Sequence, residues 1–517
     1  MSDVRCSLAA TPDLDASLSR LLISANARFS ASMLWLRAIP SDLQETPTTV
    51  KSMEFKRLAN PPQAALAPRQ ATYGWAWSTP GLAYAVFVLN AAVILAFWWF
   101  SSGFEITRSA SDAFNGLGRV TGLLGTYLVL WQLLLMARLP WLERAFGLER
   151  MAVLHKVNGY LALALLIGHA VFQTFGYQLG DGKNVASQLA DFISSYDGLL
   201  AATVSLGLFV AVVVMSVTIA ARRLAYETWY FIHLYAYLAV ALAFSHQLAT
   251  GVDFAGNPAF VWYWSALYVV IGGSLVLFRV VEPLATYRRH RFRVQAVEKE
   301  ARGVFSVYIS GRDLDQFEAQ AGQFAIWRFL DRKRWWQAHP FSISALPDGR
   351  RLRITIKSIG DFTSAIHTLK PGTPVLVDGP FGKFTERPSH PKVLLIAGGI
   401  GITPIRPLAE EMAGDGFDVR VLYRAHSEGD LVFKKEIDAL SAQHGVRVDY
   451  LVPHQGGRQP GRDSWFAPAT MGRLVPDIAD RVVYVCGPIG MAAAVRTSLK
   501  ALGVRSDQIR TEAFRLQ

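Results

Sequence analysis

Long apolar runs separated by short polar segments occupy the middle of the 517-residue chain. Six such runs occur between residues 80 and 281, each close to the roughly 20 residues that a helix needs to cross the hydrocarbon core of a bilayer. They cover residues 82–101, 117–138, 152–175, 198–220, 228–249 and 259–281. The pattern predicts six membrane-spanning helices.

After Tyr287 the pattern changes to short apolar strands separated by polar turns. Residues 285–388 contain strand-like runs and one convincing helix, at 361–369, which is typical of a small antiparallel barrel. Residues 389–517 alternate apolar strands with helical segments, which predicts a parallel α/β sheet. The predicted strands are 304–309, 322–329, 351–357, 393–397, 419–423, 446–451 and 482–486.

The predicted fold class is therefore a multidomain membrane protein. It comprises a six-helix all-α transmembrane bundle (80–284), an antiparallel β-barrel domain (285–388) and a parallel α/β domain (389–517). Residues 1–79 contain no run of membrane length, and the acidic residues Asp3, Asp13 and Asp15 argue against a signal or transit peptide. We expect a cytosolic, partly disordered extension here. Residues 14–38 could form a short amphipathic helix, and Met53 could be the true start.

Composition supports a membrane protein, because 51% of residues are hydrophobic and only 18% are charged. Lys plus Arg 52 minus Asp plus Glu 40 gives a net charge of +12. The basic loop residues fall mainly on one side of the bilayer, so the charge indicates topology and not nucleic-acid binding. That side carries Arg138, Arg144, Arg150, Arg222, Arg223, Arg288, Arg289 and Arg291, and the other carries Arg108 and Lys183. Both termini are therefore expected in the cytosol, in a multi-pass protein of the cell (inner) membrane.

The two cysteines, Cys6 and Cys486, lie at opposite ends of the chain. Two distant thiols cannot build a disulfide framework, a thiolate zinc site or an iron-sulfur cluster.

Four histidines lie inside the apolar runs, where ionisable groups are costly and usually functional. His155 and His169 belong to the third run, and His233 and His246 to the fifth. These two helices run in the same direction, so the histidines form two levels, roughly 20 Å apart at 1.5 Å per residue. The sequence predicts one pair at each level, His155 with His233 and His169 with His246.

Imidazole is a good iron ligand, and a haem between two helices takes one histidine from each. We therefore predict two haems held by these histidine pairs. A separation of 14 residues returns to within about 40° of the same helix face, whereas 13 residues falls about 140° away. The fifth helix must then be distorted, or its rings must reach around it. The alternatives are hydrogen-bonded core histidines and a proton relay.

The segment His339-Pro340-Phe341-Ser342, with Gly322-Gln323-Phe324 upstream, resembles the flavin motif of the ferredoxin-NADP reductase superfamily. The resemblance implies that Ser342 hydrogen-bonds the flavin N5 edge. It also implies that Phe341 packs on the flavin ring and that His339 and Pro340 line the dinucleotide.

A strand, a glycine turn and a helix start follow between Ile356 and Thr363. Backbone N–H groups at a helix N-terminus favour phosphate. In the resembled family this segment holds the FAD pyrophosphate, which implicates Lys357, Gly360, Phe362 and Thr363. An ordinary N-capped helix is the alternative.

A second glycine-rich turn, from Gly398 to Pro404, follows an apolar strand and precedes a helix, as in dinucleotide sites. Its GxGxxP spacing resembles the nicotinamide domain of the reductase superfamily and marks Gly398, Gly399, Gly401, Thr403 and Pro404. Cys486, Gly487 and Pro488 supply the second expected loop, with Cys486 facing the nicotinamide. Alternatively, Cys486 is a buried strand residue and Pro488 begins a helix.

Three further residues are candidates near the nicotinamide. The ending Thr511-Glu512-Ala513-Phe514 resembles the family's terminus, in which Phe514 would cover the flavin and Glu512 would belong to the catalytic set. Arg424, after a strand, could pair with a 2′-phosphate and select NADPH. A surface arginine is the alternative for Arg424, and a core or surface phenylalanine for Phe514.

The order of these parts resembles the ferric reductase/NADPH oxidase superfamily over residues 80–514. The resemblance implies hydride transfer from NADPH or NADH to FAD, then single electrons through an inner and an outer b-type haem. Arg119 resembles the family arginine beside the outer haem, with snorkelling to lipid headgroups as the alternative. Gln173 stands where superoxide-forming members often have a histidine.

The predicted function is a superoxide-forming NAD(P)H oxidase that uses O2, with a ferric-chelate reductase as the alternative. A transporter with a regulatory nucleotide domain is an alternative of another class. The expected partners are the lipid bilayer, NAD(P)H and the electron acceptor, with no nucleic acid.

Overall fold

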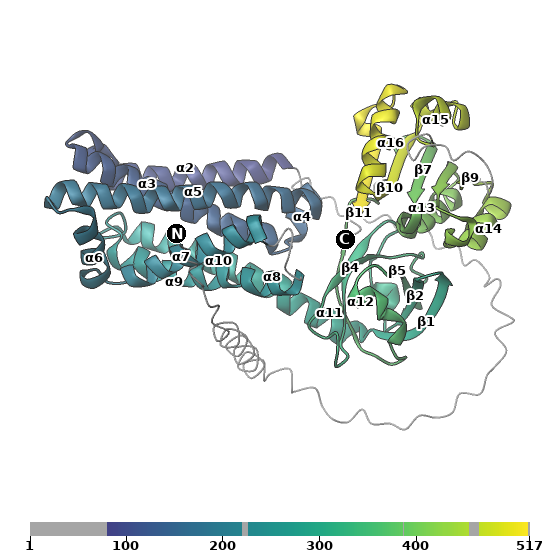
Figure 1. Ribbon diagram of the computed structural model, residues 1–517, viewed down its shortest axis with the longest axis horizontal. Coiled ribbons are helices and arrows are strands. Elements are labelled where there is room, and N and C mark those ends of the chain that lie inside the picture. Colours follow the sequence, from purple (N-terminus) through teal and green to yellow (C-terminus); the bar gives the residue numbers. More distant parts are fainter. Residues whose placement is uncertain (1–79, 220–225, 386, 454–464, 515–517) are drawn as a thin grey trace, which may run out of the picture. The chain divides into compact units, whose positions relative to one another are not determined.

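A computed structural model describes residues 80–219, 226–385, 387–453 and 465–514 (Figure 1). The predicted extension over 1–79, and the helix suggested within it, lie outside the described residues.

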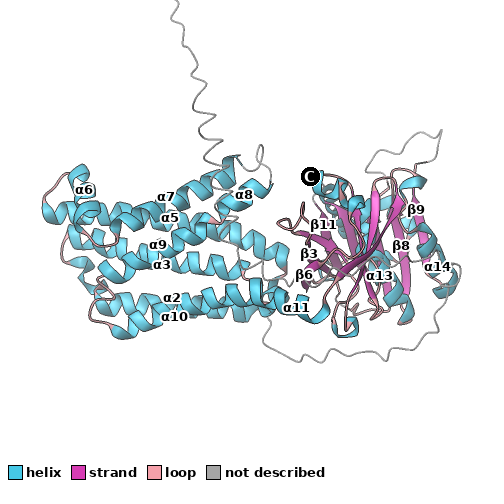
Figure 2. Cartoon of the chain, turned by 90° about the horizontal axis from the view of Figure 1, so that it is seen from below, coloured by secondary structure: helices cyan, strands magenta, loops and turns pink. Residues whose placement is uncertain are grey.

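The apolar runs form long helices that lie side by side in both Figure 1 and Figure 2. Among the described residues, six helical spans are long and apolar enough to cross a membrane, which confirms the prediction. Their helices are α2 (Pro80–Ser101), α3 (Ala110–Met136), α5 (Leu148–Asp181), α7 (Leu199–Val214), α8 (Tyr226–His233) with α9 (Tyr235–Thr250), and α10 (Pro258–Val276).

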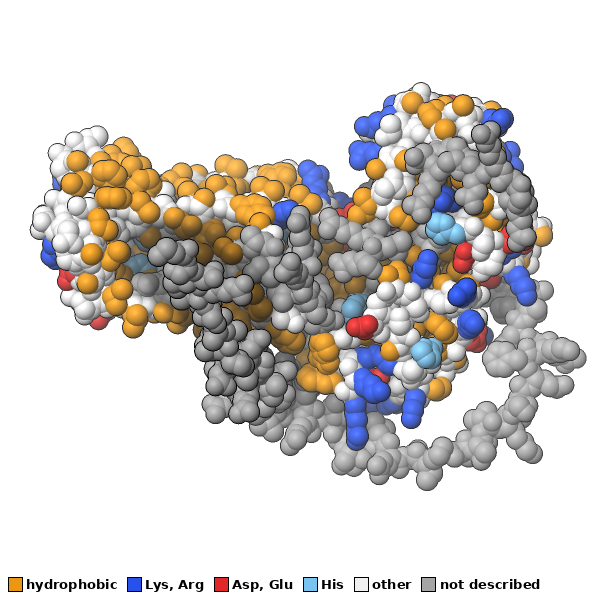
Figure 3. Space-filling model, in the orientation of Figure 1, with side chains coloured by type: hydrophobic (Ala, Val, Ile, Leu, Met, Phe, Trp, Pro, Cys, Tyr) orange, Lys and Arg blue, Asp and Glu red, His pale blue; other side chains and the backbone are white. Residues whose placement is uncertain are grey.

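Shorter helical segments join these spans. They are the 3₁₀ turn η2 (Gly103–Thr107), α4 (Pro140–Phe146), α6 (Val185–Ser195), the π turns η3 (Met215–Ile219) and η4 (Leu277–Val281), and α11 (Glu282–His290). On the face shown in Figure 3, hydrophobic side chains dominate the helical region. Phe100, Trp262 and Val269 are 81%, 77% and 72% exposed, as expected for side chains that face lipid.

Glycines let α3 and α5 approach closely. A Cβ atom added to Gly122 would lie 2.5 Å from Nδ1 of His169, and one added to Gly118 would lie 2.7 Å from Nε2 of Gln173. Small residues allow such backbone approach in membrane bundles. The α3 backbone therefore forms the wall against which the His169 ring lies.

Residues 293–381 form six strands in two three-stranded antiparallel sheets, ordered β1-β2-β5 and β4-β3-β6. Single bridges next to the strand ends join β1 to β6 (Arg293 with Pro374) and β4 to β5 (Ile343 with Ile354). The two sheets form the predicted antiparallel domain, which is called the barrel below. The strands are β1 (Arg293–Ala301), β2 (Val304–Ser310), β3 (Phe324–Phe329), β4 (His339–Ser342), β5 (Arg351–Lys357) and β6 (Val375–Phe381).

The helix predicted at 361–369 is shorter than expected. It is divided into α12 (Asp361–Ser364) and the 3₁₀ turn η6 (Ile366–Thr368). Ile366 and Leu369 are buried in the barrel core, so packing of these two side chains accompanies the tighter turn.

The last domain is a five-stranded parallel sheet of order β11-β10-β7-β8-β9, as predicted. Its strands are β7 (Lys392–Gly398), β8 (Asp418–Arg424), β9 (Arg447–Leu451), β10 (Val482–Pro488) and β11 (Ile509–Phe514). Helices α13 (Ile402–Gly414) and α14 (Lys434–His444) cover one face, and α15 (Pro468–Leu474) and α16 (Ile489–Ala501) cover the other. The 3₁₀ turn η7 (Gly399–Gly401) links β7 to α13.

Candidate functional site

The four membrane histidines face one another in two pairs, matched by depth as predicted. The ring centres of His155 and His233 are 6.0 Å apart, and those of His169 and His246 are 6.3 Å apart. Two imidazoles that share one metal ion, with bonds of about 2.0 Å and ring centres slightly beyond 1 Å from the nitrogen, have centres roughly 6.3 Å apart. Each pair is therefore spaced to hold one metal ion between its rings.

Each ring uses its Nδ1 atom for a hydrogen-bond contact with an oxygen. The partners are the carbonyls of Gln132 (3.3 Å from His155) and Gly118 (2.7 Å from His169), and the hydroxyls of Ser216 (3.4 Å from His233) and Thr250 (2.8 Å from His246). Such contacts orient a ligating ring and leave Nε2 for the metal. Among the described residues, no cluster of three or more His, Cys, Asp or Glu side chains could hold a metal ion. Each level therefore offers two imidazole rings as candidate metal ligands.

The fifth span is broken at its inner histidine. Helix α8 ends at His233, α9 begins at Tyr235, and Leu234 between them adopts a turn. The Leu234 amide lies 3.1 Å from the Tyr230 carbonyl and 3.2 Å from that of Phe231, and the Tyr237 amide bonds the Leu234 carbonyl at 3.0 Å. The first of these is an ordinary i→i−4 bond, and the other two are i→i−3 bonds, which tighten the chain locally. A local distortion of the fifth helix is one of the two alternatives that the 13-residue spacing predicts, and α5, with its 14-residue spacing, is continuous.

A charged group lies near the outer pair, on the helix that contacts His169. Arg119 places its Nε atom 3.7 Å from the carboxylate of Asp253, whose other oxygen accepts a 2.7 Å hydrogen bond from Ser102. Burial raises the pKa of Asp253, which is 4% exposed, while Ser102 and Arg119 act in the opposite direction. Arg119 thus turns toward a buried acid and not toward lipid headgroups.

Two polar atoms of α3 lack hydrogen-bond partners within the described part of the chain. They are Nε of Arg119 and Oδ1 of Asn115, and both are buried. Gln173 occupies the position where superoxide-forming members of the resembled family often have a histidine. Its side chain donates a 3.2 Å hydrogen bond to the Asn115 carbonyl. Buried polar groups normally have partners, so the outer level can accept a further polar group.

Three rings gather at the predicted flavin motif. The ring centres of His339 and Phe362 are 4.0 Å apart, and Phe341 lies 6.2 and 6.3 Å from them. Strand β4 supplies His339 and Phe341, and α12 supplies Phe362. Ser342, 6% exposed, is held opposite Phe324 of β3. The motif is therefore ordered by strand pairing, with aromatic faces beside the serine.

The predicted phosphate turn has an internal partner. Oγ1 of Thr363 accepts hydrogen bonds from the amides of Ile359 at 2.9 Å and Gly360 at 3.0 Å. Thr363 is the third residue of the helix, so its side chain satisfies the amide of Gly360, the N-cap residue, which has no side chain of its own. A role in holding the FAD pyrophosphate stays a prediction for this segment.

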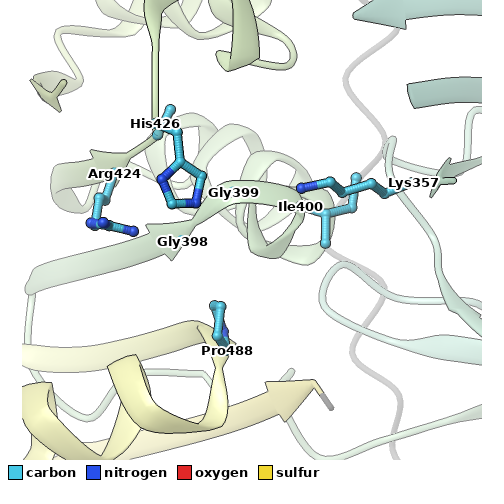
Figure 4. Close-up of a pocket in the computed structure, with 8 residues that line it drawn as sticks. Lys357, Gly398, Gly399, Ile400, Arg424, His426 and Pro488 are labelled. Atoms are coloured by element: carbon cyan, nitrogen blue, oxygen red, sulfur yellow. The ribbon is translucent and has the colours of Figure 1, made fainter. Parts of the chain in front are cut away.

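A pocket lies at the glycine-rich turn after β7 (Figure 4). Its lining residues are Lys357, Gly398, Gly399, Ile400, Arg424, Ala425, His426 and Pro488. The structure thus brings the two predicted dinucleotide loops together with Arg424. In Figure 4, Lys357 approaches from one end of the pocket, and Arg424 and His426 lie toward the other. Three nitrogen-bearing side chains in one pocket suit an anionic nucleotide.

The pocket also shows what sequence reasoning missed. His426 was not predicted, although its position two residues after Arg424 was the available signal. Lys357, expected with the FAD segment, lines the pocket beside the NAD-type turn. Gly399 has φ +55°, and a Cβ atom at Gly401 would overlap the Cys486 carbonyl, so both glycines are required by the local backbone. Thr403 and Pro404 are buried in the start of α13.

Cys486 and Glu512 lie side by side on β10 and β11. Cys486 is fully buried in the domain core, and burial, followed by the charges of Glu512 and Glu149, raises its pKa well above the ordinary value. The thiol therefore stays protonated at neutral pH. Burial also raises the pKa of Glu512, to about 8, with a smaller contribution from Glu149. Phe514 ends β11 opposite Pro488, but its side chain lies outside the described residues.

Hydrogen bonds and an ion pair join α4 and the residues next to it to the barrel. A carboxylate oxygen of Glu143 accepts a 2.9 Å hydrogen bond from the Gly382 amide, and the Lys383 ammonium donates to the Ala145 carbonyl at 2.8 Å. Arg138 forms an ion pair with Asp378. The segment between α3 and α5 thus contacts the barrel immediately before the helix that carries His155.

Comparison with protein families gives three matches in chain order. Residues 121–244 match the ferric reductase like transmembrane component, 288–385 an FAD-binding domain, and 395–497 an oxidoreductase NAD-binding domain. The first contains all of His155, His169 and His233 and ends just before His246. The second and third contain the flavin motif and the pocket turn.

Individual relatives match parts of the chain. A flavohemoprotein of Pseudomonas putida is 30% identical over 51% of this chain and 70% of its own length. An NADPH oxidoreductase of Mycobacterium tuberculosis is 27% identical over 46% of this chain and 62% of its own. An NADH-cytochrome b5 reductase 2 of Scheffersomyces stipitis is 33% identical over 26% of this chain and 48% of its own length. The chain thus spans about half to two thirds of the length of several curated relatives.

Among solved structures, the flavohem-like FAD/NAD binding domain of a nitric oxide dioxygenase from Vibrio cholerae is 26% identical. The match covers 44% of the present chain and 99% of the Vibrio cholerae domain, with a TM-score of 0.36. With the three family matches in order on one chain that carries six membrane-length helices, the protein belongs to the ferric reductase/NADPH oxidase superfamily and is an NAD(P)H-dependent oxidoreductase.

Proposed function

We propose that the chain carries electrons from cytosolic NAD(P)H through FAD and two b-type haems to O2 on the outer side of the cell membrane, forming superoxide. The observation that carries the proposal is the pair of facing imidazoles at each of two depths, 6.0 and 6.3 Å between ring centres. A transporter would need no such spacing, and the family matches describe oxidoreductase modules.

The residues of the bundle fit haem on three grounds. The ring separations suit one shared iron, the Nδ1 contacts leave Nε2 for the metal, and no third protein ligand competes at either level among the described residues. On the helix that carries the His169 contact, Oδ1 of Asn115 and Nε of Arg119 form no hydrogen bond within the described residues, although Nε of Arg119 lies 3.7 Å from the Asp253 carboxylate. A haem carboxylate or an anionic product would give them a partner.

FAD, when bound, would supply the chemistry that converts a two-electron hydride donor to single-electron transfer. The chain's own residues bind and orient. Gly399 and Gly401 let a pyrophosphate approach the backbone, while Arg424 and His426 offer cationic or hydrogen-bonding groups to the nucleotide. Ser342 and the rings of Phe341 and Phe362 line the flavin position. Cys486 is buried in the domain core and does not line the pocket, so its place beside the nicotinamide stays a prediction.

The direction of transfer rests on the loop charges. The cytosolic assignment of the side that carries Arg138, Arg144 and Arg150 places the barrel and the α/β domain in the cytosol, where NAD(P)H is available. His155 and His233 then form the inner level, and His169 and His246 the outer.

A second candidate acceptor is an Fe(III) chelate, with the same electron path. Gln173 favours it, because this side chain bonds the Asn115 carbonyl at the place where superoxide-forming relatives often have a histidine. Arg119 serves either acceptor, since a guanidinium stabilises a reduced oxygen anion and also attracts an anionic chelate.

The test uses purified protein loaded with haem and FAD. A reduced-minus-oxidised spectrum should show b-type bands, with two haems per chain, and their absence would refute the proposal. Dye reduction sensitive to superoxide dismutase in air is expected to exceed anaerobic reduction of an Fe(III) chelate. The reverse order would assign the reductase activity.

A further inference from the structure

Strand β5 presents two different faces. The barrel core takes Leu352, Ile354 and Ile356. Because side chains alternate along a strand, Arg353, Thr355 and Lys357 share the opposite face. Arg353 contacts the α/β domain, and Lys357 lines the dinucleotide pocket. One strand face therefore joins an interdomain contact to the pocket wall.

Arg353 makes an extensive contact across the two domains. Its guanidinium donates two hydrogen bonds to the carboxylate of Glu436 in α14, at 2.7 and 3.0 Å, and a third to the Ser344 carbonyl at 2.7 Å. The guanidinium carbon also lies 4.3 Å from the ring centre of Phe433. The Arg353 side chain is 7% exposed. Bidentate pairing, burial and an aromatic face distinguish this contact from an ordinary surface ion pair.

Glu436 is held from both sides. It lies in the first turn of α14, where a helix favours negative charge, and it also pairs with Nε of Arg406 in α13 at 2.8 Å. Burial alone raises the pKa of Glu436, but the hydrogen bonds and charges of Arg353 and Arg406 outweigh it, so the pKa lies below its ordinary value. The carboxylate stays ionised at neutral pH.

Phe433 reinforces the same contact. This residue precedes α14 with φ +61°, a conformation that a bulky residue adopts only at a cost. The left-handed turn places its ring beneath the Arg353 guanidinium. The loop that ends at Phe433 begins with Arg424 and His426, which line the pocket. The ion pair therefore anchors the end of the loop that forms one pocket wall.

We propose that Arg353 and Glu436 are positioning residues that fix the separation of the two walls of the dinucleotide pocket. This inference rests on the proposed function, in which a nicotinamide must reach the flavin. Lys357 lies four residues from Arg353, about 13 Å along the strand, and stands on the barrel wall. Arg424 and His426 stand on the other wall. Hydride transfer needs reacting atoms about 3 to 3.5 Å apart, so a small change in separation slows the reaction more than it weakens binding.

The test compares Arg353→Met, Glu436→Gln and the double variant in the full, FAD-loaded protein. Anaerobic stopped-flow absorbance measures flavin reduction at saturating NADPH. We expect each single variant to lower the limiting rate about tenfold, with a smaller change in the NADPH concentration at half-maximal rate. The nicotinamide–flavin charge-transfer absorbance should weaken in parallel. The double variant should be no slower than the slower single variant, because both residues act through one contact.

Asp449→Asn is the matched control. It removes the carboxylate that pairs with Arg420 at 2.9 Å, an ion pair within the α/β domain that does not reach the barrel. Flavin content and melting temperature are measured for every variant. The double variant leaves neither buried charge alone, so it retains the fold best.

Three results would overturn the inference. The first is a double variant with full flavin content and the wild-type rate, and the second is single losses that multiply in the double variant. The third is a wild-type protein whose flavin neither NADPH nor NADH reduces, which would remove the proposed function as well. Only the third affects the wild type, so the two failures are distinguishable.

Discussion

At the scale of single residues, three nitrogen-bearing side chains line the dinucleotide pocket. Arg424 lies in the pocket with the glycine turn, in the place where a 2′-phosphate would be recognised. Lys357 and His426 add nitrogen atoms to the same pocket, so we expect these two side chains to contribute to nucleotide binding together with Arg424.

Replacing Arg424 with Ala should weaken NADPH more than NADH. Loss of a charged hydrogen bond to phosphate costs about 1.5 to 3 kcal/mol, which corresponds to roughly a 10- to 100-fold rise in KM for NADPH. Steady-state kinetics with both nucleotides measure the effect, and Arg473→Ala, an exposed arginine of the same domain, is the control. Equal losses for the two nucleotides would remove Arg424 from phosphate selection.

Glu512 should make stability depend on pH in an unusual direction. Its pKa is raised by burial to about 8 in the folded chain, against 4.5 ordinarily, so the folded state binds the extra proton between these values. The stability present below pH 4.5 is then lost as pH rises toward 8. Glu512→Gln should flatten the melting temperature between pH 5 and 8, whereas the exposed Glu298→Gln should not. An unchanged slope in Glu512→Gln would show that this carboxyl is ionised.

At the scale of elements, helix approach and helix breaks decide whether the histidine rings meet. The α3 backbone touches the His169 ring at Gly122, and the turn at Leu234 separates the segments that carry His233 and His246. Each feature lies next to a histidine that we predict to bind haem. Neither residue would bind the haem itself, but each affects the orientation of the neighbouring imidazole ring.

Replacing Gly122 with Ala should displace His169 and lower outer-haem content. The added Cβ would lie 2.5 Å from Nδ1 of His169, so the ring or the helix must move. Pyridine-haemochrome analysis should fall from two haems per chain toward one. Gly207→Ala in α7 is the control, because no atom lies within 4 Å of its added Cβ. Two retained haems in Gly122→Ala would show that the helices separate without affecting the site.

Sequence patterns locate the helices and strands but do not locate the break in the fifth helix. Span lengths and β-strand periods were sufficient to locate the six spans and the predicted strands. The 13-residue spacing further predicted a distortion in the fifth helix or rings that reach around it. Its location at Leu234 could not be predicted, because packing against neighbouring helices selects where a helix breaks.

At the scale of the whole molecule, the transmembrane, FAD-binding and NAD-binding domains follow one another along the chain. The contacts of Glu143 and Lys383 with α4 and the barrel join the flavin domain to the segment that precedes His155. The Arg353 contact joins the barrel to the α/β domain. Each domain is thus linked to the next by specific polar contacts.

Replacing His246 with Leu should interrupt the proposed electron path at the outer haem. NAD(P)H should still reduce the flavin and the inner haem, while acceptor reduction should fall to background because the outer haem is lost. Anaerobic spectra before and after admission of acceptor measure both steps. His367→Leu, an exposed histidine of the barrel, is the control. Retention of two haems would refute the pairing of His169 with His246.

The sequence by itself determined the six spans, the depths of the four histidines, the barrel, the parallel sheet and the two glycine-rich loops. These follow from local periods and from the thickness of a bilayer, which act on neighbouring residues. Only the tertiary structure decided the Nδ1 partners of the rings, the place of Lys357 in the dinucleotide pocket and the contact of Arg353 with Glu436, 83 residues away. Such contacts depend on how distant elements pack, and no local pattern encodes that packing.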